Sequence, residues 1–262
     1  MILDEIMRHK RRDLAERREA VPLDDVIAMG RDRPAPLDFA AALRGEGVGL
    51  IAEVKRASPS KGVLCDDFNP LGLARTYASN GAVAISVLTD LRFFLGSLDD
   101  LIRIRHGLDA DIPLLRKDFI FDAYQVHEAY AFGADALLLI AAVLSNESLE
   151  GLLSLTRELA MTALVEVHDR EELERVLPLE PSVVGINNRD LHDFTVDLDS
   201  FGRLRSLVPD GVVTVAESGV RSVEDVRRLA AVRADAMLVG EALVTAENGA
   251  AKVRELAGAG SA

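Results

Sequence analysis

Short apolar runs alternate with amphipathic segments along most of the chain. From Leu50 onward the apolar runs are rich in β-branched residues and nearly continuous, which is typical of parallel strands covered by helices. Eight such runs predict strands over residues 50–54, 83–88, 112–116, 136–140, 163–167, 183–186, 212–216 and 236–239.

The segments between these runs carry apolar residues at helical spacing. They predict helices over residues 70–79, 98–106, 123–132, 147–159, 170–176, 198–207, 223–231 and from about Ala242. Eight strand–helix units of this kind close naturally into an α/β fold, the (β/α)₈ TIM barrel. An open doubly wound sheet is the alternative, but no Gly-x-Gly-x-x-Gly motif follows the first strand.

The first part of the chain has a helical pattern without strands. Shorter helices are predicted near residues 24–29 and over about 37–44. Acidic residues are interspersed in the basic cluster over residues 8–18, so a solvated helix face is favoured over an RNA-binding surface. We expect one domain over residues 1–262, in which 1–48 is an N-terminal helical extension.

Two similar tripeptides occur directly before predicted strands. The tripeptides Gly133-Ala134-Asp135 and Arg233-Ala234-Asp235 precede the fourth and eighth predicted strands. They are predicted to end a helix and start a strand, and they suggest an internal structural repeat. The last six residues, 257–262, are small and are expected to fray.

Composition narrows the class of protein. The 262 residues are 49% hydrophobic, and the formal net charge is −13 with a pI of about 4.9. This charge argues against a general nucleic-acid or anionic-membrane surface. No secretory signal opens the chain, and no stretch approaches the roughly 18 apolar residues of a membrane span. The sequence therefore predicts a cytoplasmic protein with no nucleic-acid or membrane partner.

The cysteine and histidine content argues against a metal site. Cys65 is the only cysteine, so neither an intrachain disulfide nor a thiolate metal cluster can form within one chain. The five histidines show no His-Glu-x-x-His spacing. We expect no metal and no cofactor.

Polar and charged residues follow six of the predicted strands where each strand ends. The ends of parallel barrel strands meet at one mouth, which is where barrel active sites lie. A salt bridge across the rim could account for any one of these residues, but not readily for six strand ends together. The residues are Glu53 and Lys55, Lys117, Glu166, Asn187 with Arg189, Glu217-Ser218-Gly219, and Gly240-Glu241.

The end of the first strand is the densest of these segments, in the stretch GLIAEVKRASPSKG. Glu53 and Lys55 alternate onto the same side of the strand, so they could form an ion pair beside a turn or belong to a shared acid–base pocket. The other strand ends favour the pocket. The loop from Ser58 to Gly62 is rich in small polar residues and is predicted to be a mobile lid.

A phosphate site is predicted after the last two strands. Ser218-Gly219 and Gly240 expose backbone N–H groups where barrels often bind phosphate, and helices begin nearby. Glycine loops alone are weak evidence, because tight turns need glycine anyway.

The motifs, taken together, resemble one family. IAEVKRASPSKG, LLRKDFIFDAYQVHEA, GADALLLIAAVL, ALVEVHD, GINNRDL, AESGV and LVGEAL occur in this order. They closely resemble indole-3-glycerol phosphate synthase, from about Ile2 to Leu243. In that family an N-terminal helical extension covers the barrel mouth, and no cofactor or metal is used. The resemblance implies conversion of 1-(2-carboxyphenylamino)-1-deoxyribulose 5-phosphate into indole-3-glycerol phosphate, carbon dioxide and water.

The resemblance also implies roles for the residues at the strand ends. Lys117 would be the general acid, and Lys55 would lie beside the substrate carboxylate or phosphate. The sequence leaves open whether Lys55 shares the acid role. Glu166 and Glu53 would handle the protons of the dehydration, and Glu217 would bind substrate or align a lysine. Asn187 and Arg189 would orient the substrate carboxylate. The phosphate would be held by Ser58, Ser218, Gly219 and Gly240.

Chemistry at neutral pH would require shifted pKa values at these groups. A lysine acts as an acid near neutral pH when desolvation or a neighbouring cation lowers its pKa. A glutamate donates a proton when an apolar site or another carboxylate raises its pKa. Glu241 departs from the family pattern, in which many relatives carry a small hydroxyl residue at this position beside the phosphate.

Other functions remain open at this point. Another phosphosugar barrel enzyme is possible, such as a phosphoribosyl-anthranilate isomerase or a Schiff-base aldolase, whose lysine would be a nucleophile. A catalytically silent barrel is less favoured, because it has no need of buried like charges. The expected partner is a small phosphosugar substrate, and the expected state is a monomer, with a weak dimer as the alternative.

Overall fold

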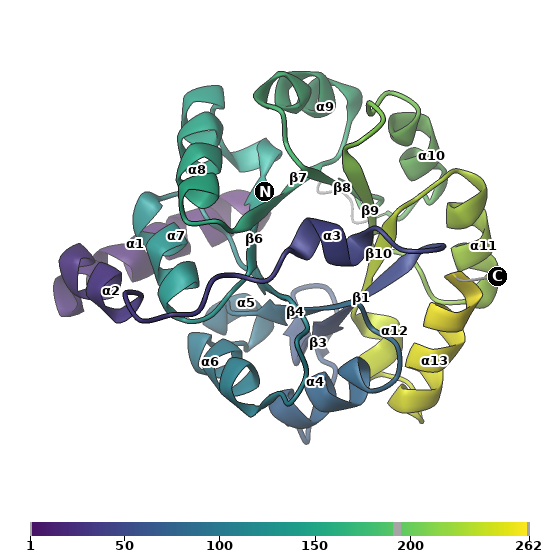
Figure 1. Ribbon diagram of the computed structural model, residues 1–262, viewed down its shortest axis with the longest axis horizontal. Helices are drawn as coiled ribbons and strands as arrows, with labels where there is room; N and C mark the ends of the chain where they lie inside the picture. The colour runs from purple at the N-terminus through teal and green to yellow at the C-terminus, as the bar shows by residue number, and fades with distance from the viewer. Residues whose placement is uncertain (1, 191–194, 261–262) are drawn as a thin grey trace.

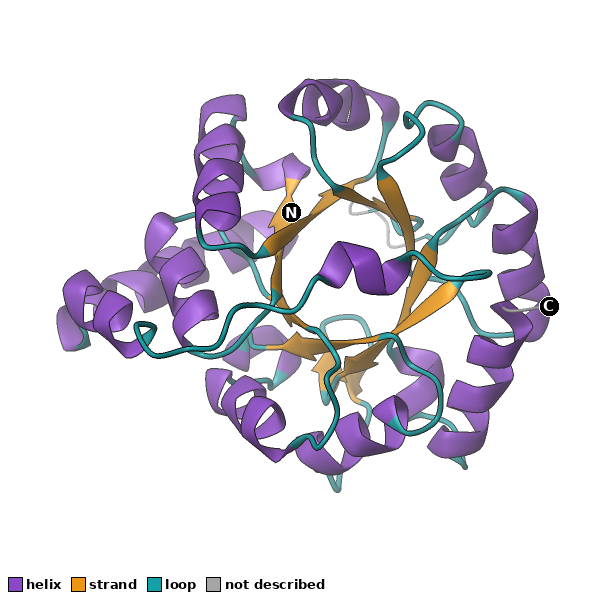
Figure 2. Cartoon of the chain, in the orientation of Figure 1, coloured by secondary structure: helices purple, strands orange, loops and turns teal. Residues whose placement is uncertain are grey.

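Eight parallel strands close into a barrel in the computed structural model, which describes residues 2–190 and 195–260 (Figures 1 and 2). Around the barrel the strands follow the order β1-β10-β9-β8-β7-β6-β5-β4. Their bounds are β1 Gly49–Val54, β4 Ala84–Leu88, β5 Leu114–Lys117, β6 Ala136–Ile140, β7 Thr162–Val167, β8 Val183–Asn187, β9 Val213–Glu217 and β10 Ala236–Val239. The eight predicted strands and the TIM-barrel fold are confirmed.

Helices cover the outside of the barrel, as Figure 2 shows. They are α4 Pro70–Ala78, α6 Leu98–Gly107, α7 Ala123–Ala131, α8 Asn146–Glu158, α9 Arg170–Val176, α10 Asp199–Arg205, α11 Val223–Ala231, α12 Glu241–Val244 and α13 Gly249–Gly260. Several begin at an Asn, Ser or Asp whose side chain accepts a hydrogen bond from a free backbone N–H of the first turn, as Asn69 and Ser97 do.

Some short elements were not predicted. They are the hairpin of β2 (Ala57–Ser58) and β3 (Gly62–Val63), the short helix α5 (Leu91–Phe94), and two 3₁₀ turns, Ala141–Val143 and Leu177–Leu179. The single helix predicted from about Ala242 is two helices, α12 and α13. The chain turns between them, and the Asn248 side chain accepts from the Ala251 N–H to start α13.

Alternate residues of each strand point into the barrel and form layers. The lower layers are apolar and include Ile51, Leu115 and Val183. The short helix α3 (Phe39–Leu43) lies across the floor, where Phe39 and Leu43 pack under these layers; Figure 1 shows it in front of the barrel opening. The lower barrel is therefore a sealed core, and the polar inward positions lie at the opposite end.

The N-terminal extension contacts both ends of the barrel. Helix α1 (Ile2–Ala20) lies at the mouth, where Lys10 pairs with Asp90 and Asp118, which follow β4 and β5. Helix α2 (Leu23–Met29) packs on α7, and α3 closes the floor. The expectation that the extension covers the mouth is thus correct for α1 only. The apolar side chains of α3 are instead buried under the barrel.

The basic cluster of α1 is solvated only in part, so that prediction is correct for its exposed arginines and wrong for Lys10. Lys10 is only 4% exposed, and the Arg17 guanidinium lies 2.7 Å from Glu128 on α7. These two cations are seven residues apart and therefore lie on the same side of the helix, with Leu14 between them. Arg8 and Arg12 are exposed, as predicted.

The repeated tripeptides end a helix and start a strand, as predicted. Gly133 and Arg233 both have positive φ, 93° and 59°. Each following aspartate then accepts from the backbone of the strand next to its own: Asp135 from Leu114 N–H and Asp235 from Thr214 N–H, both at 2.8 Å. The repeat therefore places the same capping contact four strands apart around the barrel.

The C-terminal residues described do not fray. Helix α13 continues to Gly260, whose carbonyl accepts from the Val48 N–H at 2.9 Å. A side chain at Gly260 would collide with the Val48 carbonyl, so the small residue permits this close approach. Ser261 and Ala262, for which fraying was also predicted, lie outside the described residues.

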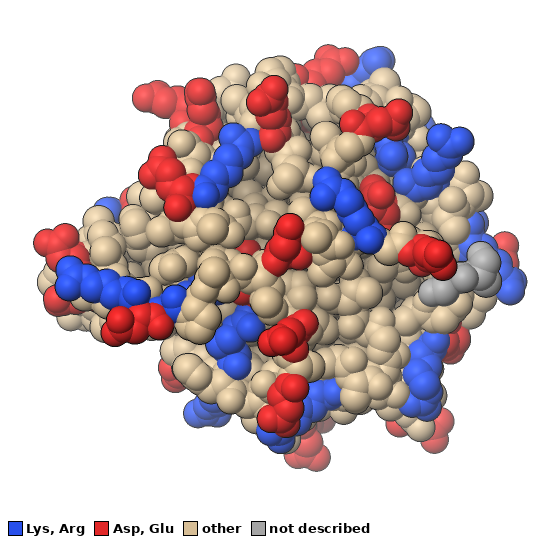
Figure 3. Space-filling model, in the orientation of Figure 1, with Lys and Arg blue, Asp and Glu red and all other residues tan. Residues whose placement is uncertain are grey.

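The charges on the floor face are mixed in sign. Figure 3 shows lysine and arginine side chains interspersed with aspartate and glutamate on this face, without a continuous basic stripe. Within residues 2–190 and 195–260, none of the helices has the length and apolar character needed to cross a membrane.

Candidate active site

The predicted catalytic residues meet at the barrel mouth, in the topmost inward-facing layer. Strand register places neighbouring ends side by side: Asn187 on β8 pairs with Glu217 on β9, and Glu166 on β7 lies beside the end of β6. Glu53, Glu166 and Glu217 are each less than 4% exposed. The prediction that charged groups of separate strands converge is therefore confirmed as geometry.

Lys117 is at the centre of this cluster. Its Nζ lies 3.4 Å from Glu217 Oε2 and 3.5 Å from Glu166 Oε2. Burial by itself lowers the pKa of Lys117. Attraction to the carboxylates of Glu217, Glu166 and Glu53 outweighs burial and raises that pKa above its usual value. The expectation of a lowered lysine pKa is wrong for Lys117, because carboxylates rather than cations surround it. Lys117 is an ammonium at neutral pH.

Glu217 differs from an ordinary surface carboxylate in its protonation state. Burial raises the pKa of Glu217 to about 8. The Lys117 charge opposes this rise, and the negative charge of Glu166 adds to it. Its Oε1 finds no hydrogen-bond partner among the described residues. A buried carboxyl that keeps its proton near neutral pH, with one oxygen unused by the protein, can donate that proton to a ligand.

Glu166 differs from Glu217 although the two lie around the same lysine. Burial alone would raise the pKa of Glu166, but the Lys117 ammonium, then the His168 ring, and then the Asn187 amide outweigh burial and hold it well below its usual range. The Asn187 Nδ2 donates to Glu166 Oε1 at 3.2 Å. Glu166 is thus a carboxylate that can accept a proton, and the two neighbouring glutamates have divided acid–base roles.

Glu53 and Lys55 form the ion pair that the first strand predicted. Lys55 Nζ lies 2.8 Å from Glu53 Oε2 and 5.9 Å from the centroid of the Phe94 ring. The next residues fold as the β2–β3 hairpin, in which the Ser58 Oγ is buried and unpaired with any described residue. An unused buried hydroxyl at the mouth is available to a ligand.

Two connected cavities open from this cluster. One, of about 180 Å³, has an apolar wall formed by Ile6, Phe94, Phe119, Leu138 and Ile140. The sequence reasoning missed this wall, because the side chains come from α1, α5, the loop after β5 and strand β6 and share no motif. An aromatic ring would be desolvated against it.

The second cavity, of about 100 Å³, contains the predicted phosphate residues. Ser218, Gly219 and Gly240 line it together with Arg189. Ser218 and Gly219 have positive φ, 65° and 93°, and a Cβ on Gly219 would lie 2.6 Å from Val196 Cγ1. Four of the five predicted binding residues are therefore brought together, with small residues where the backbone must turn, whereas the fifth, Ser58, lines the other cavity.

Glu241, which departs from the family pattern, does not leave a free charge at this cavity. Its carboxylate lies 2.6 Å from Lys61 Nζ at the tip of the hairpin and 3.3 Å from Arg221. Burial would raise the pKa of Glu241, but the bond to Lys61 and the neighbouring arginines lower it instead. The negative charge at this position is thus neutralised by two cations.

Gly185 and Asn188, which support the cluster, were missed by sequence reasoning, whereas Gly240 was predicted as a binding residue. A side chain at Gly185 in β8 would collide with the Glu217 carboxylate, and one at Gly240 would collide with that of Glu53. Asn188 is buried and donates to the Glu217 and Ser218 carbonyls at 3.0 and 3.1 Å. A glycine in the interior of a strand was the available signal, since it often marks a close approach of another group.

Gly185→Ala is expected to displace the Glu217 carboxylate without unfolding the barrel. The added methyl takes the space of Glu217 Oε1, so the carboxyl must rotate away from Lys117. We expect kcat to fall about 10- to 100-fold, in the range typical for a misplaced acid–base group. Steady-state kinetics of the purified variant measures the effect.

Gly151→Ala is the matched control for this substitution. Gly151 lies in α8, and no atom lies within 4 Å of the position that a Cβ would take. Activity should therefore stay at the wild-type level. Equal activity of Gly185→Ala and Gly151→Ala would contradict the role of Gly185.

No group of three or more His, Cys, Asp or Glu side chains that could hold a metal ion occurs in the described part of the chain. The buried carboxylates of the cluster are each paired with a lysine or with the histidine ring. What the arrangement offers is the Lys117 ammonium, the protonated Glu217 carboxyl and the ionised Glu166 carboxylate, with the Glu53–Lys55 pair beside them.

Comparisons with known proteins identify one family. The family model described as "Indole-3-glycerol phosphate synthase" matches residues 3–256. The chain is similar to the indole-3-glycerol phosphate synthase of Roseiflexus sp. (strain RS-1), at 54% identity over 98% of both chains. It is 50% identical to that of Dehalococcoides mccartyi (strain CBDB1), over 98% of this chain and 100% of the relative.

A solved structure supports the fold alone. The 3-hexulose-6-phosphate synthase of Salmonella typhimurium superposes with a TM-score of 0.66 at 12% identity, over 81% of this chain and 98% of that chain.

Proposed function

The chain belongs to the indole-3-glycerol phosphate synthase family, and we propose that the cluster around Lys117 is the catalytic centre through which it acts. It is a carboxy-lyase of tryptophan biosynthesis. It converts 1-(2-carboxyphenylamino)-1-deoxyribulose 5-phosphate into indole-3-glycerol phosphate, carbon dioxide and water.

One observation carries the assignment of the site: the acid–base cluster lies between an apolar cavity and a glycine-lined one. Lys55, Lys117 and Asn187 line both cavities. The substrate has an aromatic ring at one end and a phosphate at the other, and its reacting carbon atoms lie between them. Seating the ring on Phe94 and Phe119 therefore places those carbons at the cluster.

The phosphate would then be bound in the second cavity. Backbone N–H groups at Ser218, Gly219 and Gly240, with the Arg189 guanidinium, suit a phosphate dianion. The Ser58 hydroxyl at the hairpin adds a further donor near the opening. Lys55, held by Glu53, would face the substrate carboxylate.

Ring closure needs a proton on the substrate carbonyl oxygen. A bond forms between the carbonyl carbon and the ring carbon that bears the carboxylate, and the carbonyl oxygen becomes a hydroxyl. Lys117 donates this proton as an ammonium, and its positive charge also stabilises the developing alkoxide. Carbon dioxide then leaves, and the electron pair of the broken bond restores the aromatic ring.

Dehydration needs one acid and one base. The hydroxyl leaves as water after taking a proton from an acid, and the neighbouring carbon loses a proton to a base. Protonated Glu217 suits the first task and ionised Glu166, with Glu53 nearby, suits the second. Over the whole reaction, the substrate in its carboxylate form takes up one proton.

The rival functions fit the cluster less well. A Schiff-base aldolase needs a neutral lysine as nucleophile. Lys117 lies between two carboxylates that keep it charged, and Lys55 is paired with Glu53 at 2.8 Å. A silent barrel would have no use for this concentration of buried charge.

The pH profile of the reaction tests the acid role of Glu217. A donor must be protonated, and the pKa of Glu217 is about 8, so kcat should be constant well below pH 8, fall through a midpoint near pH 8 and continue to fall as the pH rises. Glu217→Gln keeps the size of the side chain but removes the acid. We expect its kcat to be about 100-fold lower and the alkaline fall to be absent.

The experiment follows formation of indole-3-glycerol phosphate and carbon dioxide from about pH 6 to about pH 10. A wild-type profile that stays flat to the upper limit, or a variant that keeps the same alkaline fall, would contradict the role of Glu217. Absence of product from folded wild-type protein would contradict the function itself.

We further propose that residues 1–262 act as one domain, in the monomeric state and in the cytoplasm. A phosphorylated small substrate, a single cysteine and an acidic composition support this setting. Sedimentation equilibrium distinguishes the monomer from a weak dimer.

A further inference from the structure

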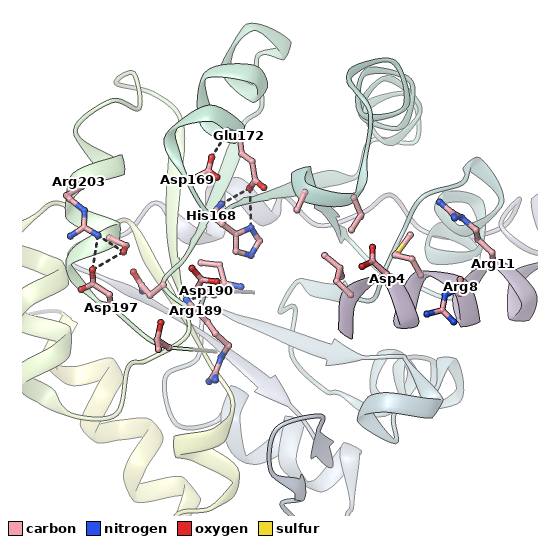
Figure 4. A pocket seen from close by; sticks show the side chains of 18 residues that line it. Asp4, Arg8, Arg11, His168, Asp169, Glu172, Arg189, Asp190, Asp197 and Arg203 are labelled. Atoms are coloured by element: carbon pink, nitrogen blue, oxygen red, sulfur yellow. Dashed lines mark hydrogen bonds and ion pairs between the residues drawn. The ribbon is translucent and has the colours of Figure 1, made fainter. Parts of the chain in front are cut away.

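A large cavity of about 830 Å³ lies beside the barrel mouth, between α1 and the segments that follow β7 and β8 (Figure 4). His168 lies in its wall, two residues after Glu166 and thus on the same side of the strand. Asn187 and Arg189 line this cavity and the two of the active site. His168 is therefore a titratable group next to the cluster to which the mechanism above gives no role.

The His168 ring lies between two carboxylates. Its Nε2 is 3.2 Å from Glu166 Oε1, and its Nδ1 is 3.1 Å from Glu172 Oε2. The backbone N–H of His168 donates to the same Glu172 oxygen at 2.8 Å, as the dashed lines in Figure 4 show. Glu172 is held in turn in the first turn of α9, where Asp169 caps its N–H. The ring is thus fixed in position from outside the active site.

A carboxylate oxygen near each ring nitrogen favours a charged ring, although Nε2 makes no hydrogen bond of good geometry within the described residues. A neutral imidazole carries one N–H, and with that hydrogen on Nδ1 toward Glu172 the lone pair of Nε2 would face Glu166. Burial lowers the pKa of His168, but Glu166 and Glu172 outweigh it and raise that pKa to about 10. The other charged side chains lining the cavity are of both signs: Asp4, Arg8, Arg11, Asp169, Arg189, Asp190, Asp197 and Arg203.

We propose that His168 and Glu172 are positioning residues that hold the Glu166 carboxylate as the proton acceptor of the reaction. His168 and the Asn187 amide both lie at Oε1, which leaves Oε2 beside Lys117 and facing the shared space. The inference rests on the proposed role of Glu166 and extends it. A histidine and a glutamate that need not touch the substrate hold this base in position.

The pH dependence of kcat tests this proposal. Glu166 works only when ionised, so activity is lost as the pH falls through its pKa. Removing the His168 cation with His168→Gln should raise that pKa and move the acidic midpoint of kcat upward by about one unit. Near neutral pH we expect kcat to be about tenfold lower and KM to change less than about twofold, because the substrate contacts remain.

Glu172→Gln is the second variant, and it leaves every side chain of the active site in place. Because it weakens the hold on the ring, it should shift the acidic midpoint in the same direction by a smaller amount. His106→Gln, the same substitution on the exposed face of α6, is the control and should match wild type. Thermal unfolding of each variant checks that it is folded.

The outcomes separate the two proposals. Wild-type protein that forms no product would overturn the proposed function. Active wild-type protein with the acidic limb of kcat unchanged in both His168→Gln and Glu172→Gln would overturn the positioning role alone. A rise in KM without a shift of the acidic limb would also overturn it, because it would mean that His168 only shapes the binding site.

Discussion

Lys117→Ala is expected to lower kcat about a thousandfold, because it removes both the proton donor and the charge that stabilises the developing alkoxide. The barrel should remain folded. Glu217 already holds its proton near neutral pH, since its pKa is about 8, so loss of the ammonium leaves it neutral, and Glu166 keeps the contacts to His168 and Asn187. Single-turnover measurement of product formation gives the effect on the chemical steps.

Lys252→Ala is the matched control, since Lys252 lies on α13 and its ammonium pairs only with Glu255 among the described residues. It should retain wild-type activity. A second readout follows from the charges: without Lys117 the pKa of Glu217 should rise further, because the group that opposes its elevation is gone. A kcat within tenfold of wild type in Lys117→Ala would refute the assignment of the acid.

Lys10→Met is expected to have the largest effect on stability, about 3–5 kcal/mol in the free energy of unfolding. Lys10 Nζ lies 2.6 Å from Asp118 and 3.4 Å from Asp90, and all three side chains are almost fully buried. The substitution removes the cation and leaves two carboxylates in the interior. Asp118 keeps a contact to Arg116, while the Asp90 side chain keeps, within the described residues, only the Phe93 N–H that it caps.

The same substitution should change acid unfolding and substrate affinity. Burial would raise the pKa of Asp118, but the positive charges of Lys10 and Arg116 outweigh burial and hold that pKa well below its usual range. A lowered pKa contributes stability above the unfolded value of about 3.9, which is lost as the pH falls toward the folded value. Lys10→Met should therefore unfold at a higher pH than wild type. KM should also rise, because Ile6 on α1 lines the apolar cavity.

Urea unfolding at neutral pH and acid titration measure these effects. Arg12→Met is the control, because Arg12 is exposed on the same helix. Its stability should lie within about 0.5 kcal/mol of wild type. If Lys10→Met were as stable as Arg12→Met, the buried network would not anchor α1 to the barrel.

Much of the fold was predictable because its signals are local. A strand buried on both sides must be apolar for its whole length, so runs such as 136–140 and 236–239 could be placed closely. The polar residue that ends such a run points into the mouth by alternation alone. This is why Glu53 and Glu166 could be assigned to the site before any contact was known.

The features that were missed depend on partners distant in the chain. The burial of Lys10 requires Asp90 and Asp118, which lie on two later loops. The role of Gly185 depends on Glu217 of the next strand. The floor position of α3 depends on apolar layers contributed by most of the barrel strands. None of these leaves a pattern in the residue's own neighbourhood.

The sequence by itself determined which residues reach the barrel mouth, because alternation along a strand and the closure of eight parallel strands leave little choice. Only the tertiary structure decided their protonation. Glu166 and Glu217 are both buried glutamates at strand ends and cannot be told apart by sequence spacing. Glu166 lies against His168 and Asn187 and stays ionised. Glu217 has an oxygen without a partner among the described residues and keeps its proton. The balance between burial and nearby charges, which depends on distances of a few ångströms, sets that difference.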